Sequence, residues 1–222
     1  TADFPATNNM VNIIIVGAGG LGREIFGYVQ DCISSGKPWK IKGFIDDNPN
    51  ALQGYKYETK IISSMENYLP SPDDTLVCAI GTPKIKKEKV EKLLERGAKF
   101  TTLVHPTAYV GPNVVLGEGA VICPRVSLTC DISIGKFALL NIATGCGHDS
   151  QIGDFATISG FCDITGFCKV GEGAFLASHV SMIPNSEIGK WSKVGIGSTV
   201  ILKIKDNESA FGNPAVPLRL RK

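Results

Sequence analysis

The chain has 222 residues, of which 43% are hydrophobic and 20% charged, and its formal net charge is +2. This composition is typical of a globular protein with one large domain or two small ones. The small net charge argues against nucleic acid or a membrane surface as the main partner, and no apolar run reaches the roughly 20 residues of a transmembrane helix.

The first nine residues and the cysteines indicate the compartment. TADFPATNN has no apolar segment of a signal peptide, so Met10 is interpreted as the natural start and residues 1–9 as a cloning remnant. The chain has seven cysteines, an odd number, and no CxxC pair. We therefore expect free thiols in a reducing cytoplasm, and no metal site.

Residues 10–103 alternate strand patterns with helix patterns. Apolar runs and helical spacing place the expected elements at 11–16 (strand), 23–33 (helix), 41–45 (strand), 75–80 (strand) and 84–96 (helix). Such alternation with short loops predicts a small parallel sheet with right-handed crossovers. The expected fold of this part is a Rossmann-like α/β domain.

After residue 103 the helix patterns end and a period of six begins. Of the seventeen positions taken every sixth residue from Val104 to Val200, fifteen are aliphatic, and the exceptions are Cys146 and Met182. The residue four places later is always small or β-branched, and the residue directly after the aliphatic one is glycine eight times. A fixed short period of this kind is typical of a solenoid.

Six residues make one short strand and a turn, and three such hexads make one triangular coil. The aliphatic and the small residue of each hexad occupy its two inward positions. Because three hexads complete one coil, residues three hexads apart should stack at the strand spacing of about 4.8 Å. Glycine at the corner is expected to permit turn dihedrals that other residues resist. We predict a left-handed parallel β-helix of about five coils over 104–205, an exception to the right-handed crossover tendency, with 206–222 as a cap or tail.

The stretch GCGHDSQIGD (145–154) carries the clearest chemical signal. His148 occupies neither inward position of its hexad, so its side chain should lie at the outer surface near a corner. Gly166, three hexads later, would leave space for a substrate and expose an N–H to a developing oxyanion. Asp149 would orient the imidazole and raise its basicity. Position alone also allows a solvated histidine without a role.

The stretch GAGGLG (17–22) follows a predicted strand and fits GxGxxG. One interpretation is a dinucleotide fingerprint with Asp46 on the ribose, but a first domain of about 95 residues leaves little room for both halves of a dinucleotide fold. A second interpretation is a phosphate site for another nucleotide ligand at the helix N-terminus. A third is a tight turn needed for packing alone.

Together these motifs resemble the hexapeptide-repeat acyltransferases, most closely the sugar acyltransferases of the NeuD/PglD type, which carry a small Rossmann-like domain before the β-helix. The resemblance covers about 10–217. The family pattern His-Asp/Glu-x-x-Ile-Gly-x-Phe is met by His148, Asp149, Ile152, Gly153 and Phe155. Members are usually trimers that bind acyl-CoA between adjacent prisms.

The resemblance also implies roles for single residues. His148 is the implied general base and Asp149 the carboxylate that tunes it. Contacts with acyl-CoA are implied for Gly166, Thr157, Ser178 and Ile196. Contacts with a nucleotide-linked sugar are implied for Gly19, Gly20, Leu21, Asp46, Asp47, Gly81 and Asn141. Two positions depart from the family, which often has histidine where this chain has Leu21 and Thr157.

We therefore expect a homotrimeric, acetyl-CoA-dependent N-acetyltransferase that needs no metal. Its acceptor would be the amine of a nucleotide-linked amino sugar made for surface glycans. One alternative is O-acetylation of a free sugar such as sialic acid. Another is a sensor that binds a nucleotide or NAD in the first domain and uses the β-helix as a scaffold.

Overall fold

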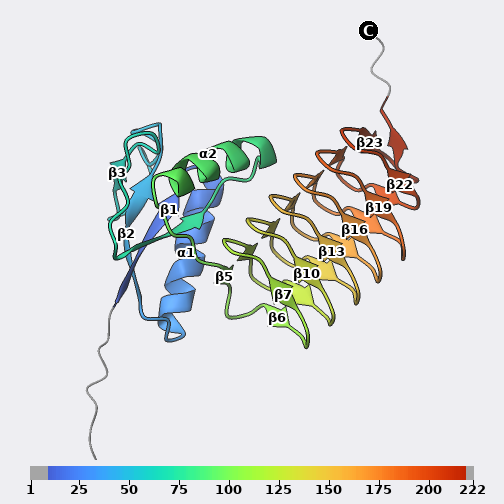
Figure 1. Ribbon diagram of the computed structural model, residues 1–222, viewed down its shortest axis with the longest axis horizontal. Helices are drawn as coiled ribbons and strands as arrows, with labels where there is room; N and C mark the ends of the chain where they lie inside the picture. The colour runs from blue at the N-terminus through green and yellow to red at the C-terminus, as the bar shows by residue number, and fades with distance from the viewer. Residues whose placement is uncertain (1–9, 219–222) are drawn as a thin grey trace, which may run out of the picture.

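An α/β unit lies beside a long parallel β-helix (Figure 1). The computed structural model describes residues 10–218, so the interpretation of residues 1–9 and the end of the predicted 206–222 segment lie outside the described residues. The first unit consists of β1 (Val11–Val16), α1 (Gly20–Ser34), β2 (Trp39–Ile45), β3 (Ile61–Ser63), β4 (Asp74–Cys78) and α2 (Pro83–Glu95).

The four strands of this unit form one parallel sheet in the order β3-β2-β1-β4. Ile13, Ile14 and Ile15 of β1 are fully buried, because the strand lies inside the sheet and both of its faces are covered. Helix α1 buries one stripe at helical spacing: Gly22, Ile25, Val29 and Cys32. The predicted α/β unit is confirmed, whereas β3 escapes the sequence pattern because none of its three residues is buried.

From Leu103 onward the chain winds as a three-sided prism. The first face holds β5 (Leu103–Val104), β8 (Val121–Ile122), β11 (Leu139–Leu140), β14 (Thr157–Ile158), β17 (Phe175–Leu176), β20 (Lys193–Val194) and β23 (Ser209–Phe211), with β24 (Val216–Pro217) antiparallel to β23. The second face holds β6 (Tyr109–Val110), β9 (Ser127–Leu128), β12 (Gly145–Cys146), β15 (Asp163–Ile164), β18 (Ser181–Met182) and β21 (Thr199–Val200). The third face holds β7 (Val115–Leu116), β10 (Ser133–Ile134), β13 (Gln151–Ile152), β16 (Lys169–Val170), β19 (Glu187–Ile188) and β22 (Lys203–Ile204).

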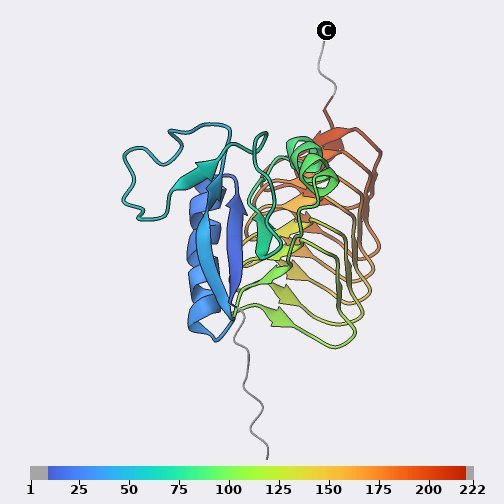
Figure 2. The same ribbon diagram turned by 60° about the vertical axis from the view of Figure 1, so that its left-hand side comes forward.

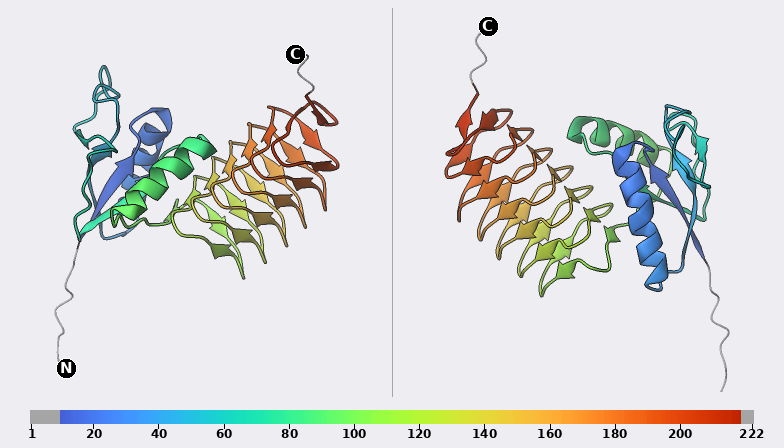
Figure 3. Two further views of the ribbon diagram at one scale, coloured as in Figure 1. Left: turned by 45° about the horizontal axis from the view of Figure 1, so that its top comes forward. Right: turned by 180° about the vertical axis from the view of Figure 1, so that it is seen from behind.

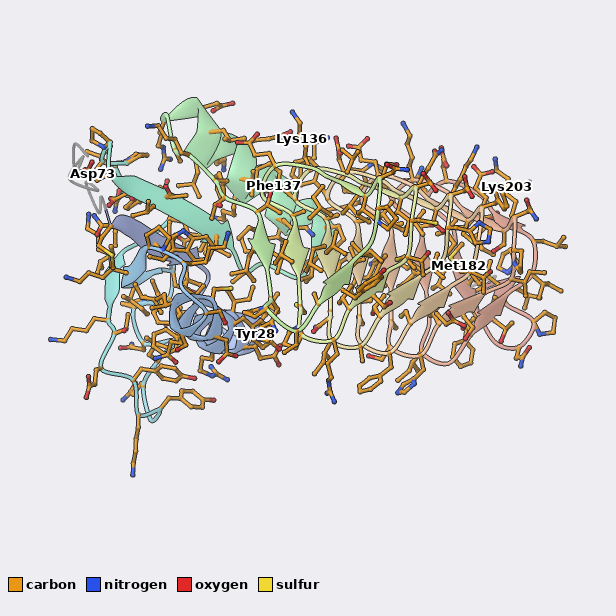
Figure 4. All side chains as sticks on the ribbon, turned by 90° about the horizontal axis from the view of Figure 1, so that it is seen from below. Tyr28, Asp73, Lys136, Phe137, Met182 and Lys203 are labelled. Carbon is orange, nitrogen blue, oxygen red and sulfur yellow. The ribbon has the colours of Figure 1, made fainter. Side chains whose placement is uncertain are left out.

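We call the edge between the first and second faces the first corner, that between the second and third faces the second corner, and the remaining edge the third corner. Neighbouring coils pair three hexads apart, as Leu140 does with Ile158. Near the C-terminal end one coil is shorter, and there Glu187 pairs with Lys203. Each of the second and third faces has six strands, one coil more than the sequence indicates. Met182 lies inside the prism, whereas Lys136 and Lys203 point outward (Figure 4).

The glycines of the repeat have a different purpose from the one expected. The glycines directly after the aliphatic residues do not have positive φ. A later residue of the same corner has it, and this is mostly a residue other than glycine, such as Asp149 at 60° and Phe167 at 60°. At Gly147, a Cβ atom would lie 2.7 Å from the backbone nitrogen of Gly166, and at Gly153 it would lie 2.5 Å from that of Glu172. Glycine is therefore required by the close approach of the next coil, and the expectation about turn dihedrals is wrong.

The α/β unit packs against the first face and the third corner of the prism, with α2 lying along the coils (Figures 2 and 3). Lys86 is fully buried in this contact, and its Nζ donates to Ala156 O at 3.1 Å and to Thr157 Oγ1 at 2.9 Å. Lys87 Nζ lies 2.9 Å from Glu172 Oε1. His105, in the first coil, contacts Asp31 Oδ2 at 3.0 Å. The two parts of the chain are thereby joined by polar contacts, of which those of Lys86 are buried.

Stability should depend on pH through Lys86. Burial lowers the pKa of this lysine from 10.5 to about 8. Between these values the unfolded chain binds more protons than the folded one, so the free energy of unfolding should rise as the pH is raised from 8 to 10.5. Lys86→Met should remove about 2 kcal/mol of this rise, measured by urea unfolding at pH 7.5 and pH 10.

Lys92→Met is the matched control, because Lys92 lies on the same helix and is exposed. It should follow the pH dependence of the unsubstituted protein. A pH dependence in Lys86→Met equal to that of the unsubstituted chain would contradict the assignment.

Candidate active site

His148 and Asp149 form a pair at the second corner, in the turn between β12 and β13. Asp149 Oδ2 lies 2.8 Å from His148 Nδ1, and the two side chains are 45% and 54% exposed, respectively. Asp149 adopts positive φ, a conformation that aspartate tolerates better than most residues. When Nδ1–H donates to the carboxylate, Nε2 carries the lone pair and is free to accept a proton.

Gly166 and Phe167 fix the position of the imidazole from the next coil. A Cβ atom on Gly166 would lie 2.7 Å from both Cε1 and Nε2 of His148, so only glycine leaves room for the ring. The imidazole and the Phe167 ring form a T-shaped pair, with ring centroids 5.1 Å apart and planes at 90°. Phe167 was not among the predicted site residues, but its place exactly one coil after Asp149 is the signal that could have found it.

Two cysteines lie near His148, and both are held as thiols. Cys146 points into the prism, and burial raises the pKa of its thiol far above the usual range. Cys130, in the preceding coil, has a thiol pKa raised by its hydrogen bond with Asp131, by desolvation and by the charges of Asp131 and Asp149. Because the thiolate is the reactive form, this arrangement favours His148 as the group that carries the chemistry.

The other predicted acyl-CoA residues do not meet His148 within one chain. Ser178 and Ile196 lie at the first corner, across the second face, and so does Asn141, which was assigned to the acceptor. Thr157 lies on the first face, buried beneath Lys86. Only Gly166 shares the second corner with His148.

The second face between the two corners is a shallow groove of about 310 Å³ that reaches Gly166. Small and polar side chains dominate its lining, which includes Ser127, Thr129, Gly145, Gly147, Asp163 and Thr165. Large apolar side chains stand exposed along its edges: Phe161, Phe167, Ile183 and Ile196. The groove can therefore take an extended ligand whose reactive end lies beside His148.

The glycine loop divides into structural and open positions. Gly17 has a φ of 103°, and a side chain on Gly22 would collide with the Gly17 carbonyl, so these two residues shape the turn. At Gly19 nothing lies within 4 Å of an added Cβ, and at Gly20 only Arg23 Nη2 approaches, at 4.0 Å. Leu21 Cδ2 would lie 3.7 Å from a Cβ on Gly81. The open part of the loop can approach a phosphate at the start of α1.

The two acidic residues after β2 point in different directions. Asp46 Oδ2 accepts from the backbone N–H of Ala18 at 2.7 Å, so this carboxylate ties the loop to β2. Asp47 accepts from the Met65 N–H at 2.9 Å and from Lys89 Nζ at 2.7 Å. The Lys89 ammonium lowers the pKa of Asp47. The structure thus brings Asp46 to the glycine loop and directs Asp47 toward α2.

Across residues 10–218 no cluster of three His, Cys, Asp or Glu side chains could hold a metal ion. In that same part of the chain, no helix has the length and apolar character needed to cross a membrane.

Known proteins resemble the chain in both halves. The PglD N-terminal domain family matches residues 12–93. The GDP-perosamine N-acetyltransferase of Escherichia coli O157:H7 is 29% identical over 168 residues, which cover 74% of this chain and 74% of that protein. The UDP-N-acetylbacillosamine N-acetyltransferase of Bacillus subtilis (strain 168) is 33% identical over 117 residues, 51% of each chain. The chain thus carries a PglD N-terminal domain and is homologous to N-acetyltransferases of the hexapeptide-repeat superfamily.

Solved acetyltransferases share the whole architecture. PerB from Caulobacter crescentus, in complex with CoA and GDP-perosamine, has a TM-score of 0.84 at 26% identity and covers 94% of this chain and 97% of its own. The acetyltransferase domain of PglB from Neisseria gonorrhoeae FA1090 has a TM-score of 0.85 at 25% identity, with 93% and 99% covered. The predicted fold, an α/β domain followed by a left-handed β-helix, is confirmed, and so is the enzyme class.

Gly166→Ala should impair acetyl transfer without unfolding the acetyltransferase. The new methyl group would occupy the space of the His148 ring and displace it from Asp149. Loss of a positioned base typically lowers the rate by about 10² or more. Thiol release from acetyl-CoA measures the rate, and thermal unfolding reports the fold.

Gly27→Ala serves as control, because nothing lies within 4 Å of a Cβ at this position of α1. It should keep full activity. An active Gly166→Ala enzyme would show that the imidazole has room elsewhere.

Proposed function

We propose that the protein is an acetyl-CoA-dependent N-acetyltransferase acting on the amine of a nucleotide-linked amino sugar. The observation that carries the proposal is the His148–Asp149 pair at 2.8 Å, with the imidazole held against Gly166. Support for the acceptor comes from the open glycine loop and from two relatives named as N-acetyltransferases of GDP-perosamine and UDP-N-acetylbacillosamine.

This geometry supports the following reaction. The acceptor amine attacks the thioester carbonyl, and His148 Nε2 takes the proton that the nitrogen loses as the C–N bond forms. Among the described residues, no acceptor pairs with the Gly166 N–H, which is therefore available to the oxyanion. Collapse of the tetrahedral intermediate breaks the C–S bond, and the departing CoA thiolate receives the proton from His148. Asp149 stabilises the imidazolium in between.

The proposal includes a homotrimer. Leu21 of the glycine loop lies beside Gly81, and the next residues, Thr82 and Pro83, line a pocket together with Phe175 of the first face. His148 lies at the second corner, which is opposite that face in a three-sided prism. One chain therefore cannot bring its own loop to its own base. A threefold arrangement that sets the second corner of one chain against its neighbour would join them, with acetyl-CoA along the second face. We place this enzyme in the cytoplasmic synthesis of surface glycans.

His148→Ala should lower the rate of acetyl transfer by about 10² to 10⁴. The variant should keep its melting temperature and bind acetyl-CoA, because the imidazole is half exposed and lies outside the prism. The assay is thiol release from acetyl-CoA with a panel of acceptors: UDP- and GDP-linked 4-amino sugars and free sialic acid.

The same panel separates the alternatives. Release with a nucleotide amino sugar, lost in His148→Ala, supports the proposal. Thiol release with sialic acid alone would mean that the enzyme O-acetylates a free sugar, since a hydroxyl acceptor also needs the base. Thermal protection by NAD, with none by acetyl-CoA, would instead favour a sensor.

Hybrid oligomers should test the shared site. The His148→Ala variant lacks the base but has an intact glycine loop. The Gly20→Asp variant has an intact base, but its new carboxylate lies where the phosphates would bind. Each variant alone should be nearly inactive. If every site takes its loop and its base from different chains, an equal random mixture should restore about a quarter of the activity.

Two differently tagged copies of His148→Ala, coexpressed in the same way, should give no recovery. If the mixture of His148→Ala and Gly20→Asp recovers no activity although pull-down shows that hybrids form, the whole site lies within one chain.

A further inference from the structure

The second corner carries another pair of polar side chains directly before His148 and Asp149. Cys130 and Asp131 precede them by one coil of the β-helix, in the register that the paired strands set. The backbones of the two turns are joined, because Asp149 N donates to Cys130 O at 3.3 Å. Outward side chains of one turn stand beside their counterparts in the next, so Asp131 lies behind Asp149 on the corner.

Asp131 is held in place by its neighbours. Asn113, Asp131 and Asp149 have φ values of 57°, 55° and 60°, so their side chains leave the corner in the same way. Asn113 Nδ2 donates to Asp131 Oδ1 at 2.8 Å, and an amide fixes a carboxylate without neutralising its charge. The pKa of the Cys130 thiol is raised by its hydrogen bond with Asp131, by desolvation and by the charges of both aspartates. Both carboxylates therefore act on this part of the corner.

The charged or titratable groups around His148 come from the turns of this corner and from the two adjoining faces. They are Asp149 in its own turn, Cys130 and Asp131 in the turn before, Asp163 on the second face and Lys169 on the third face. The turn after His148 adds no charge, because its outward positions are Gly166 and Phe167. The electrostatic environment of the imidazole is therefore set mainly by acids.

Two of these acids stand at the corner itself. Asp163 lines the groove of the second face instead. Among the ion pairs of residues 10–218, neither Asp131 nor Lys169 takes part in any, and Asp149 pairs with His148 alone. A protonated His148 is thus the cation that both corner carboxylates share.

Negative charge is confined to one side of the imidazole. The two carboxylates lie in the coil of His148 and in the coil before it, whereas the Gly166 N–H lies one coil after it. Beyond Gly166, the outward positions of this corner are Phe167, Pro184 and Asn185, none of which is charged. The earlier carboxylate is therefore close to an imidazolium and two coils away from the proposed oxyanion, so it stabilises the first without strongly opposing the second.

We propose that Asp131 is a positioning residue of the candidate base, a second carboxylate that stabilises the imidazolium of His148 during acetyl transfer. This proposal rests on the proposed function, in which Nε2 takes the proton of the acceptor amine. Asp149 contacts the imidazole and sets its tautomer, while Asp131 adds its charge from the turn before and does not touch the substrate. Transfer becomes faster because the imidazole is charged in the transition state and neutral before it.

The titration of His148 provides a readout that needs no substrate. Proton–carbon NMR of the full-length protein resolves the rings of its three histidines, and the signal missing from His148→Ala assigns the one of interest. In Asp131→Asn the midpoint should move to lower pH by about 0.4 unit, the effect of removing one charge at about 8 Å in water-rich surroundings. Added salt should reduce this difference, because exposed charges are screened.

Three further variants separate charge from shape. Asp131→Glu keeps the carboxylate and should titrate like the unsubstituted protein. Asn113→Lys places an ammonium beside Asp131 and should move the midpoint in the same direction as Asp131→Asn. Glu118→Gln makes the same change of charge at an exposed residue of the third corner, and it should leave the titration of His148 in place.

The pH dependence of acetyl transfer provides a second readout. In Asp131→Asn the acid limb of kcat/KM should move to lower pH by the same amount, because the base then loses its proton at lower pH. Above this limb kcat should fall by up to about 2.5-fold, the equivalent of that shift. KM for acetyl-CoA and the melting temperature should not change.

The outcomes distinguish this proposal from the proposed function. A titration that stays in place in Asp131→Asn, while Asp149→Asn moves it, would overturn the role of Asp131 and leave the proposed function standing. Equal shifts in Asp131→Asn and Glu118→Gln would also overturn it, since they would reflect net charge alone. Full activity in His148→Ala would remove the proposed base, and the role of Asp131 with it.

Discussion

The register between neighbouring coils, three hexads long, is the constraint on which the rest of the structure depends. Each coil forms parallel hydrogen bonds with the next, so every outward side chain stands directly beside its counterparts one coil away. The approach is so close at Gly147 and Gly153 that a Cβ atom would meet the backbone of the next coil. These glycines hold the coils at strand spacing, and that spacing sets the distance between functional groups on neighbouring coils.

The candidate base is a product of this register. His148 lies within reach of Gly166 and Phe167 because those residues stand one coil further along the same corner. Asp149 reaches back to the imidazole from a left-handed backbone position that recurs at most corners of the prism. If His148 acts as the base, little reorganisation is left for the moment of reaction, because the ladder fixes the backbone of His148, Asp149 and Gly166.

The sequence pattern predicts what the register alone determines, and misses what depends on packing between the two parts. The outward position of His148 and its neighbour Gly166 follow from counting in sixes. Lys86 could not be found in this way, because its partners Ala156 and Thr157 lie in a distant part of the chain, on the β-helix. Asp46 is brought to the glycine loop by its bond to the Ala18 N–H, which forms only when β1 and β2 are paired. The role of the repeated glycines cannot be predicted from the pattern, because the sequence of a single coil does not show how near the next coil lies.

Packing of the α/β unit on the first face determines how the faces can be used. Lys86 and the third-corner contacts close the lower coils of this face, so Thr157 is unavailable to a ligand of its own chain. The first face becomes accessible only from Phe175 onward, beside the start of α2. The candidate base His148 stands at the second corner, opposite this open part of the first face. A single chain therefore presents the open part of its first face and the His148–Asp149 pair on different sides of the prism, and this is the separation that the proposed trimer would bridge.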